Sequence, residues 1–308
     1  MKIGFIKPQS KCERRVVLLP QDIGGINDEL YFEQDFGANM EIDDNEYIRR
    51  GARIRSREEI FTTCDAIFNL KPVEESDYPL IRKHQTFLGW LQPLTTGREF
   101  YETIFLEKEL SIIDTDIITT FYHKDKITPV QWVKKYFTWD NSVLAGYASL
   151  YHATLTHGLM IHPQTRIAVL GTGNVAQGAF QFATQLGARV RMFYRQTMDD
   201  FKKTLDLWDI IVSGIRLDDT VEHILNEEEQ MQLKKGCLVI DATGDAGRTF
   251  EGTHFSELCD PIYEYEGKFY YVVNNTPSLF YRSASEILSQ SFRLHIFNHR
   301  LQDFLNLL

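Results

Sequence analysis

The sequence predicts an α/β protein of two domains, each built around a doubly wound parallel sheet. Two observations lead to this fold class. Short apolar runs alternate with polar stretches of helical character along the whole chain, as strands alternate with crossover helices in such folds. The chain has 308 residues, and at about 150 residues per domain this length suggests two domains.

The first half of the chain supplies the first predicted sheet. Its strand candidates are Lys2–Ile6, Asp65–Leu70, Thr86–Leu91 and Leu110–Asp114. Each run is short, apolar and bounded by polar residues, which is typical of buried strands. The intervening stretches Glu41–Gly51 and Arg98–Leu110 predict helices.

A second series of strands begins near residue 166. Its candidates are Ile167–Leu170, Asp209–Ile215, Cys237–Asp241 and Tyr270–Val273. The segment Asn141–Leu159 mixes Ala, Leu and aromatic residues without proline, so we expect a helix that bridges the two halves.

The last segment, Ser283–Leu308, predicts one long helix because its apolar residues recur at mostly helical spacing. We expect this helix to return to the first domain, since nothing after the second sheet needs it. The predicted domains are therefore a substrate (catalytic) domain of residues 1–140 plus 280–308 and a nucleotide-binding domain of residues 141–279.

Composition excludes several classes of protein. The chain has 33 Lys plus Arg against 43 Asp plus Glu, a net charge of −10, which argues against nucleic-acid and membrane partners. No signal peptide or stretch of about 18 apolar residues is present. The four cysteines show no metal-ligand spacing. We expect a cytoplasmic protein with reduced thiols and no metal site.

A glycine-rich turn follows the run Ile167–Leu170 and opens a predicted helix. It reads Gly171-Thr172-Gly173-Asn174-Val175-Ala176. In this G-x-G-x-x-G/A pattern Gly171 allows the tight turn and Gly173 the approach of a pyrophosphate, while Ala176 lets helix and strand pack closely. The helix N-terminus favours the phosphates. The turn predicts a Rossmann-like dinucleotide site; the alternative is a tight turn in a plain α/β fold.

The next predicted strand ends at Tyr194-Arg195, where NAD sites usually carry an acidic residue. Without that carboxylate a 2′-phosphate is not repelled, and Arg195 can pair with it. Tyr194 is placed to stack on the adenine. We therefore predict NADP (NADPH) rather than NAD. In the alternative interpretation Arg195 is a solvated surface residue and either cofactor is used.

Three polar residues follow strands of the first predicted sheet, where ligands of open parallel sheets bind. Arg15 follows the first strand, Lys71 ends the second and Gln92 ends the third. Arginine and lysine converging on one point would bind a carboxylate. Each residue also has a plain interpretation, as a surface charge, a solvated strand end or a turn residue before Pro93.

Two residues of the second half lie in a similar position. Asp245 falls in a glycine-rich turn after the strand Cys237–Asp241, and Asn275 follows the run Tyr270–Val273. A carboxylate at this place could orient a substrate ammonium or assist proton transfer. The alternative for Asp245 is a turn residue that binds its own backbone.

With these residues identified, the chain resembles the alanine dehydrogenase and pyridine nucleotide transhydrogenase family, and within it the carboxyethylornithine synthase branch. The resemblance rests on an ordered set of segments that spans nearly the whole chain. They are KIGFIKP, ERRVVLLP, NLKPVEESDYPLI, NSVLAGYASLYHA, GTGNVAQGA, IDATGDAGRTFEGT and YYVVNNTPSLFYRSAS.

The resemblance implies two Rossmann-like domains with a cleft between them, and a homo-oligomer, a dimer or tetramer. Arg15 and Lys71 match the residues that bind the oxo-acid carboxylate and carbonyl, and Asp245 matches the active-site aspartate. Ser142 and Asn275 match positions near the cofactor. The implied reaction is an NADPH-dependent condensation of a 2-oxo acid, such as pyruvate, with the side-chain amine of ornithine or lysine.

Gln92 departs from the family pattern, which has a catalytic histidine there. Glutamine cannot transfer a proton near neutral pH. Either His123, Tyr122 or Asp245 has taken over the role, or the substrate is a preformed imine, or condensation needs little acid help, or the reaction has been lost. Two further functions stay open: a simple amino acid dehydrogenase that uses ammonia, and a nucleotide-binding protein without turnover.

Overall fold

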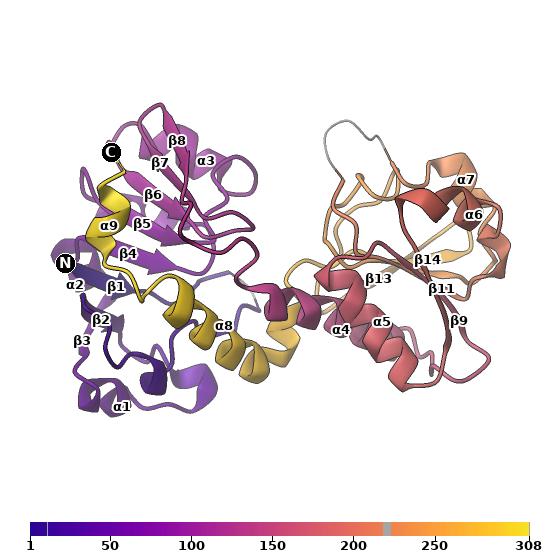
Figure 1. Ribbon diagram of the computed structural model, residues 1–308, viewed down its shortest axis with the longest axis horizontal. Coiled ribbons are helices and arrows are strands. Elements are labelled where there is room, and N and C mark those ends of the chain that lie inside the picture. The colour runs from indigo at the N-terminus through magenta and orange to yellow at the C-terminus, as the bar shows by residue number, and fades with distance from the viewer. Residues whose placement is uncertain (11, 218–222, 308) are drawn as a thin grey trace. The chain divides into compact units, whose positions relative to one another are not determined.

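The computed structural model of the protein describes residues 1–10, 12–217 and 223–307. The chain divides into two compact units, and the first is made of two separate stretches of sequence. Unit 1 contains Met1–Thr138 and Tyr281–Leu308, and unit 2 contains Trp139–Phe280. Each unit has its own sheet and its own apolar cores. Figure 1 shows the elements of both.

Unit 1 is built on a sheet of eight strands within the described residues, in the order β3-β2-β1-β4-β5-β6-β7-β8. The strands are β1 (Lys2–Phe5), β2 (Glu29–Glu33), β3 (Arg53–Arg55), β4 (Ala66–Asn69), β5 (Thr86–Gly89), β6 (Ser111–Asp114), β7 (Thr120–His123) and β8 (Lys126–Pro129). The first six are parallel, and β7 and β8 add an antiparallel edge. The four strands predicted for this half are confirmed, with ends one or two residues shorter.

The helices of unit 1 include α8 (Tyr281–His295), which covers one face of the sheet (Figure 1). The others are α1 (Asp44–Arg49), α2 (Arg57–Thr63), α3 (Arg98–Phe100) and α9 (Leu301–Leu305). A π-helical turn, Tyr101–Phe105, continues α3. The prediction of one long C-terminal helix is wrong in its length. Helix α8 ends at His295 and α9 begins at Leu301, where Oδ2 of Asp303 accepts the backbone N–H of Arg300 at 2.9 Å.

Aromatic side chains hold α8 to the sheet. The ring of Phe292 from α8 lies 5.3 Å from that of Phe68 on β4, and Phe68 in turn stacks on Phe5 of β1. Hydroxyl groups of α8 also accept backbone N–H groups from the loop after β1: Ser285 binds Val16 and Ser289 binds Leu19, each at 2.8 Å. The loop that carries Arg15 is therefore fixed to the C-terminal helix.

Unit 2 is built on a sheet of six strands among the described residues, in the order β10-β9-β11-β12-β14-β13. They are β9 (Arg166–Leu170), β10 (Arg189–Phe193), β11 (Ile210–Ser213), β12 (Leu238–Asp241), β13 (Ile262–Tyr265) and β14 (Lys268–Tyr271). All pairs are parallel except β13 with β14. The strand order reverses at β9, because β10 lies on one side of it and β11 on the other, and such a switch point is where ligands bind.

Two helices of unit 2 pack unusually closely. They are α4 (Trp139–Thr156) and α5 (Asn174–Gln185), which with α6 (Met198–Lys202) and α7 (Glu227–Met231) make up the α-helices of this unit's described residues. A Cβ atom on Gly146 of α4 would lie 1.8 Å from the Val175 carbonyl oxygen, and one on Gly178 of α5 would lie 1.9 Å from that of Val143. Glycine is therefore required at both positions, and the contact sets where α5 begins.

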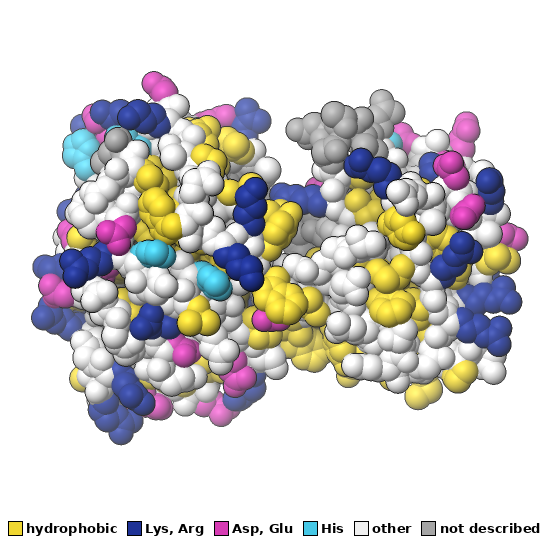
Figure 2. All heavy atoms as spheres, in the orientation of Figure 1, with side chains coloured by type: hydrophobic (Ala, Val, Ile, Leu, Met, Phe, Trp, Pro, Cys, Tyr) yellow, Lys and Arg dark blue, Asp and Glu magenta, His cyan; other side chains and the backbone are white. Residues whose placement is uncertain are grey.

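Within the described residues, no helix is long and apolar enough to cross a membrane, and no group of three or more His, Cys, Asp or Glu side chains could hold a metal ion. On the face shown in Figure 2, basic and acidic side chains are mixed over the surface of each unit. The net charge of −10 is thus not gathered into one acidic field on that face.

Candidate functional site

The residues predicted from strand ends in unit 1 come together at one edge of the sheet. Strands β1, β4, β5 and β6 are parallel neighbours, so their carboxyl ends meet there. Arg15 follows β1, Lys71 follows β4 and Gln92 follows β5. Burial and the charge of Arg15 together lower the pKa of Lys71. The two cations therefore lie within electrostatic range of each other.

Arg15 is held by a buried ion pair with Glu13, which the sequence analysis did not identify as a site residue. Nε and Nη2 of Arg15 donate to the two carboxylate oxygens of Glu13 at 2.9 and 2.6 Å. The guanidinium carbon also lies 5.2 Å from the centre of the Trp90 ring. Burial alone would raise the pKa of Glu13, but Arg15 and Lys71 hold it at about 2. Glu13 is therefore ionised and fixes the direction of the guanidinium.

Lys71 is an ammonium group that can lose its proton in the range of ordinary buffers. Burial and Arg15 lower its pKa to about 8, against the opposing attraction of Glu13 and Asp116. A lysine of this kind can polarise a carbonyl as an ammonium at pH 7 and can release a proton to a reaction. Two cations and one buried anion thus stand at the carboxyl ends of β1 and β4, a charge distribution that favours a small anion.

Gln92 begins a tight turn after β5. Its φ angle is +46°, and its carbonyl oxygen accepts the N–H groups of Thr95 and Gly97 at 3.0 Å. The Thr96 hydroxyl donates to Gln92 Oε1 at 2.5 Å. Oδ1 of Asp114, the last residue of β6, accepts the backbone N–H of Gln92 at 3.2 Å and that of Leu91 at 2.9 Å.

Asp114 is a further residue that the sequence analysis missed. Its carboxyl group is buried, and burial together with the nearby charge of Asp116 raises its pKa to about 7. The signal in the sequence was weak: Asp114 ends a strand and Asp116 follows it, as many turn residues do. Asp114 places a proton-binding group against the backbone of Gln92.

Of the groups considered as substitutes for a histidine at position 92, His123 does not fit. It pairs in register with Ser111 at the amino end of β6, and its Nδ1 lies 3.0 Å from the Ser111 hydroxyl. Gln92 lies beyond the carboxyl end of β5. A strand length of about 10 Å therefore separates the two positions. Tyr122 is buried on the same strand, and burial and Asp114 raise its pKa to about 12.

In unit 2 the glycine turn is tight and leaves open space at the start of α5. Gly171 has a φ angle of +100°, and a Cβ there would lie 2.8 Å from Ile215. At Gly173 a Cβ would approach the Gly214 carbonyl no closer than 3.9 Å, which leaves room in front of the turn. Gly173 caps α5 without a side-chain hydrogen bond. The first N–H groups of this 12-residue helix can therefore serve an anion.

Gly214 is the partner of Ala176 in this arrangement and was not identified from the sequence. A Cβ on Gly214 would lie 2.4 Å from the Ala176 backbone nitrogen and 2.8 Å from its Cβ. The glycine directly follows β11, so it allows the start of α5 to lie against the switch point of the sheet. The signal was present as a second glycine after an apolar strand, but its role depends on a neighbour distant in sequence.

The remaining predicted cofactor residues occupy other strand ends of unit 2. Tyr194 and Arg195 follow β10 and are exposed, and Asn275 follows β14 with a φ angle of +67°. Ser142 lies in the first turn of α4, next to Val143, whose carbonyl packs on Gly178. Ser142 is thus beside the second turn of α5 rather than at the glycine turn itself.

Asp245 follows β12, the neighbour of β11, at the same edge of the sheet. Its backbone N–H donates to Oδ2 of Asp241 at 3.3 Å. Asp241 is itself buried, and burial raises its pKa although Thr243 donates to it at 2.7 Å. Asp245 therefore belongs to a turn that is tied to a buried carboxyl group.

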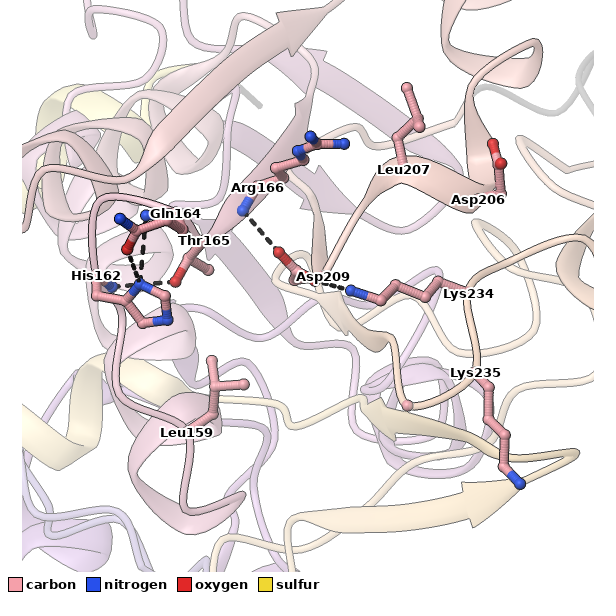
Figure 3. A pocket seen from close by; sticks show the side chains of 11 residues that line it. Leu159, His162, Gln164, Thr165, Arg166, Asp206, Leu207, Asp209, Lys234 and Lys235 are labelled. Atoms are coloured by element: carbon pink, nitrogen blue, oxygen red, sulfur yellow. Dashed lines mark hydrogen bonds and ion pairs between the residues drawn. The ribbon is translucent and has the colours of Figure 1, made fainter.

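A cavity of about 570 Å³ in unit 2 lies away from these residues (Figure 3). Its lining includes Arg166 and Gly236, which stand at or before the amino ends of β9 and β12. Asp209 in its wall accepts a hydrogen bond from the backbone N–H of Arg166 and forms an ion pair with Lys234. Since the glycine turn follows the carboxyl end of β9, we do not assign this cavity to the nucleotide.

Comparison with known proteins gives a consistent picture over the whole chain. Residues 5–130 match the family model described as alanine dehydrogenase/PNT, N-terminal domain, and residues 193–304 match the corresponding C-terminal domain. Two N(5)-(carboxyethyl)ornithine synthases, from Clostridium botulinum and Lactococcus lactis, are each 43% identical to it; both cover 100% of this chain, and it covers 98% and 99% of theirs. A solved L-alanine dehydrogenase superposes with a TM-score of 0.81 at 17% identity, over 100% of this chain and 92% of that one.

Proposed function

Because the chain belongs to the alanine dehydrogenase/PNT family, we propose that it joins a 2-oxo acid to the side-chain amine of an amino acid and reduces the product with NADPH. It is an oxidoreductase of the kind that acts on CH–NH groups, as its relatives are. The proposed oxo acid is pyruvate and the proposed amines are ornithine and lysine. The observation that carries the proposal is the buried pair of Glu13 and Arg15, together with the partly buried Lys71, at the carboxyl edge of the first sheet.

In this proposal unit 1 binds the substrates and unit 2 binds the nucleotide. Arg15, oriented by Glu13, pairs with the carboxylate of the oxo acid, and the Lys71 ammonium donates to its carbonyl oxygen. The unprotonated amine attacks the carbonyl carbon, and loss of water, with a proton from Lys71, leaves a protonated imine. When bound in unit 2, a reduced nicotinamide would supply the hydride for the carbon of this protonated imine. The nitrogen keeps one proton and becomes a secondary amine, and Asp245 steadies it.

Gln92 orients rather than transfers protons in this proposal. Its amide is held by Thr96, and its backbone by Asp114. The departing water needs a proton, and Lys71 has a pKa of about 8, close enough to neutrality to supply one. A histidine at position 92 is then not required for the dehydration.

The cofactor residues of unit 2 support NADPH. Arg195 and Tyr194 stand after β10, where the adenosine ribose of a dinucleotide lies in this fold, and neither is acidic. Arg195 would pair with a 2′-phosphate, and the N–H groups at the start of α5 would hold the pyrophosphate. All four cysteines are free thiols, which is compatible with the cytoplasmic location that we propose. We also expect the protein to form a homo-oligomer, and light scattering in solution would test this.

The deciding experiment is a panel of amines with pyruvate and NADPH. We expect NADPH consumption with ornithine or lysine, and a product in which mass spectrometry shows a carboxyethyl group on the side-chain nitrogen. Turnover with ammonia alone would indicate a simple amino acid dehydrogenase. Cofactor binding without turnover of any amine would indicate a nucleotide-binding protein, the function that Gln92 favours.

A further inference from the structure

A polar cavity in unit 1 adjoins the buried ion pair of Glu13 and Arg15. Its volume is about 250 Å³, and Glu13 and Arg15 form part of its wall. From there it extends toward Lys7, just after β1, and Glu33, the last residue of β2. The cavity is smaller than the roughly 300–1,000 Å³ of sites for drug-sized ligands, so it suits part of a small molecule. A ligand that begins at Arg15 can thus continue toward Lys7.

The acidic wall of this cavity is rigid. Oε2 of Glu33 accepts the backbone N–H of Lys7 at 2.7 Å and Nη1 of Arg57 at 2.8 Å. Arg57 is fixed from its other side by two hydrogen bonds to Asp77, at 2.8 and 2.7 Å. Both hydrogen bonds to Glu33 end on the same oxygen, Oε2. The other, Oε1, has the Lys7 ammonium as its neighbouring charge, at 3.9 Å among the described residues.

The basic wall is Lys7. Its ammonium donates to the Gln34 carbonyl oxygen at 2.7 Å, and a lysine ammonium carries three donors. A distance of 3.9 Å to Glu33 is longer than a hydrogen bond, so these two charges are close without satisfying each other. A ligand that brings both an anion and a cation could bind each of them directly.

The cavity is lined by three cations, Lys7, Arg15 and Arg57, and by two anions, Glu13 and Glu33. Arg57 forms ion pairs with both Asp77 and Oε2 of Glu33, and Arg15 pairs with Glu13. At the far end, the Lys7 ammonium and the second carboxylate oxygen of Glu33, Oε1, remain for a ligand. One positive and one negative group side by side complement a zwitterion better than a simple anion or cation, since each ligand charge then meets its opposite.

We propose that Lys7 and Glu33 bind the α-amino acid head of the amine substrate and so select amines that carry one. Lys7 pairs with the α-carboxylate and Glu33 Oε1 with the α-ammonium. The side-chain amine of the same molecule then lies toward the oxo acid at Arg15 and Lys71. The role of this site in the reaction rests on the proposed function. Binding of the amino acid head to Lys7 and Glu33 does not, and it can be measured separately.

The kinetic test compares ornithine with 1,4-diaminobutane, which has the same reactive amine and chain but no α-carboxylate. In Lys7→Met we expect kcat/KM for ornithine to fall by about tenfold or more, with the value for 1,4-diaminobutane and the KM for pyruvate unchanged. Lys83→Met, at an exposed lysine of the same unit, is the matched control. An equal loss with both amines would show that Lys7 is only structural, and would overturn the proposal.

Glu33→Gln provides a second variant, because its amide oxygen can still accept from Lys7 and Arg57 while the charge is lost. We expect weaker ornithine binding and an unchanged affinity for 5-aminopentanoate, which lacks the α-amino group. Calorimetric titration of the protein with each amine, without pyruvate, measures binding without turnover. If no amine reacts but ornithine binds in a Lys7-dependent way, the proposed reaction fails and this site stands. If ornithine does not bind, or binds to Lys7→Met and Glu33→Gln as tightly as to the wild-type protein, the site is wrong.

Discussion

Nη2 of Arg15 lies 2.6 Å from Oε2 of Glu13, and the two side chains are only 1% and 0% exposed. The residue proposed to bind the substrate carboxylate is therefore already paired with a carboxylate of the protein. This pair orients the guanidinium before substrate arrives, and Lys71 supplies the second cation. Preorganised charge of this kind costs stability unless both partners are present.

We predict that Glu13→Gln lowers the free energy of unfolding by about 3–5 kcal/mol, because it leaves the Arg15 cation buried without its partner. Urea denaturation measures the change. The double variant Glu13→Leu/Arg15→Leu should recover most of the stability but none of the activity. A loss below about 1 kcal/mol in the single variant would show that the pair is not desolvated as described.

Lys71 predicts a pH dependence of catalysis. Its pKa of about 8 means that the ammonium is lost above that pH, so kcat/KM for the oxo acid, at saturating amine, should fall as pH rises through about 8. Lys71→Arg should move this decline to higher pH, and Lys71→Met should reduce kcat by about 10²–10⁴-fold. The prediction is contradicted if Lys71→Arg retains the wild-type profile.

The same residue should oppose stability at neutral pH. Unfolded Lys71 holds its proton up to about pH 10.5, whereas the folded protein releases it near pH 8, so the free energy of unfolding should rise between these two values. Lys71→Met removes the buried charge and should raise the free energy of unfolding at pH 7 by about 1–3 kcal/mol. Urea titrations at pH 7 and pH 10 measure both effects; the variant should lack the rise.

Asp114 should contribute most to the stability of the folded protein at low pH, because burial and the charge of Asp116 disfavour its ionised form. Its folded pKa of about 7 lies above the ordinary 3.8, so its contribution is complete below about pH 4 and is lost as pH rises through 7. Asp114→Asn keeps an acceptor for Leu91 and Gln92 and should remove this pH dependence. Asp114→Ala leaves two N–H groups without an acceptor and should cost about 1–3 kcal/mol. Equal stability of the two variants would contradict the assigned hydrogen bonds.

Cofactor choice can be tested at Arg195. Arg195→Ala should raise the KM for NADPH by about tenfold and leave the KM for NADH unchanged, because only NADPH carries the 2′-phosphate. Arg189→Ala is the control, since Arg189 is exposed at the opposite end of the same strand, β10. A wild-type preference for NADH would overturn the assignment.

Gly214→Ala should weaken nucleotide binding indirectly, by displacing the start of α5 rather than by removing a contact with the nucleotide. The new Cβ would lie 2.4 Å from the Ala176 nitrogen, so the start of α5 must move away from β11. We expect a loss of about 1–3 kcal/mol in stability and a smaller thermal shift on adding NADP. Gly24→Ala is the control, because no atom lies within 4 Å of its added Cβ and its φ is ordinary. The same thermal shift in both variants would contradict the close contact.

The central strands could be predicted because buried strands consist mainly of apolar residues, which are visible in the sequence. β4, β5 and β6 are buried at every position, and apolar residues occupy the middle of each. Strands nearer the sheet edge were missed for the opposite reason: β3 reads Arg-Ile-Arg, and β8 begins with a lysine. The break between α8 and α9 was missed because apolar residues continue through it.

The site was predictable where chemistry and strand position coincide, and not where it depends on distant neighbours. Arg15 and Lys71 could be placed at one edge from the order of parallel strands. Glu13 has no special appearance in the sequence until its pairing with Arg15 is known. Asp114 and Gly214 likewise gain their roles from contacts with Gln92 and Ala176, which no local pattern encodes.

The way that α8 closes unit 1 has a consequence for synthesis of the protein. A ribosome makes Phe5 and Phe68 first, but their partner Phe292 follows more than two hundred residues later, after all of unit 2. Until then one face of the first sheet is an apolar surface without its cover, in a chain that elongates at about 5–20 residues per second. Unit 2 can fold from contiguous sequence, so it should reach its native state first, and release of the last segment should complete the substrate-binding unit.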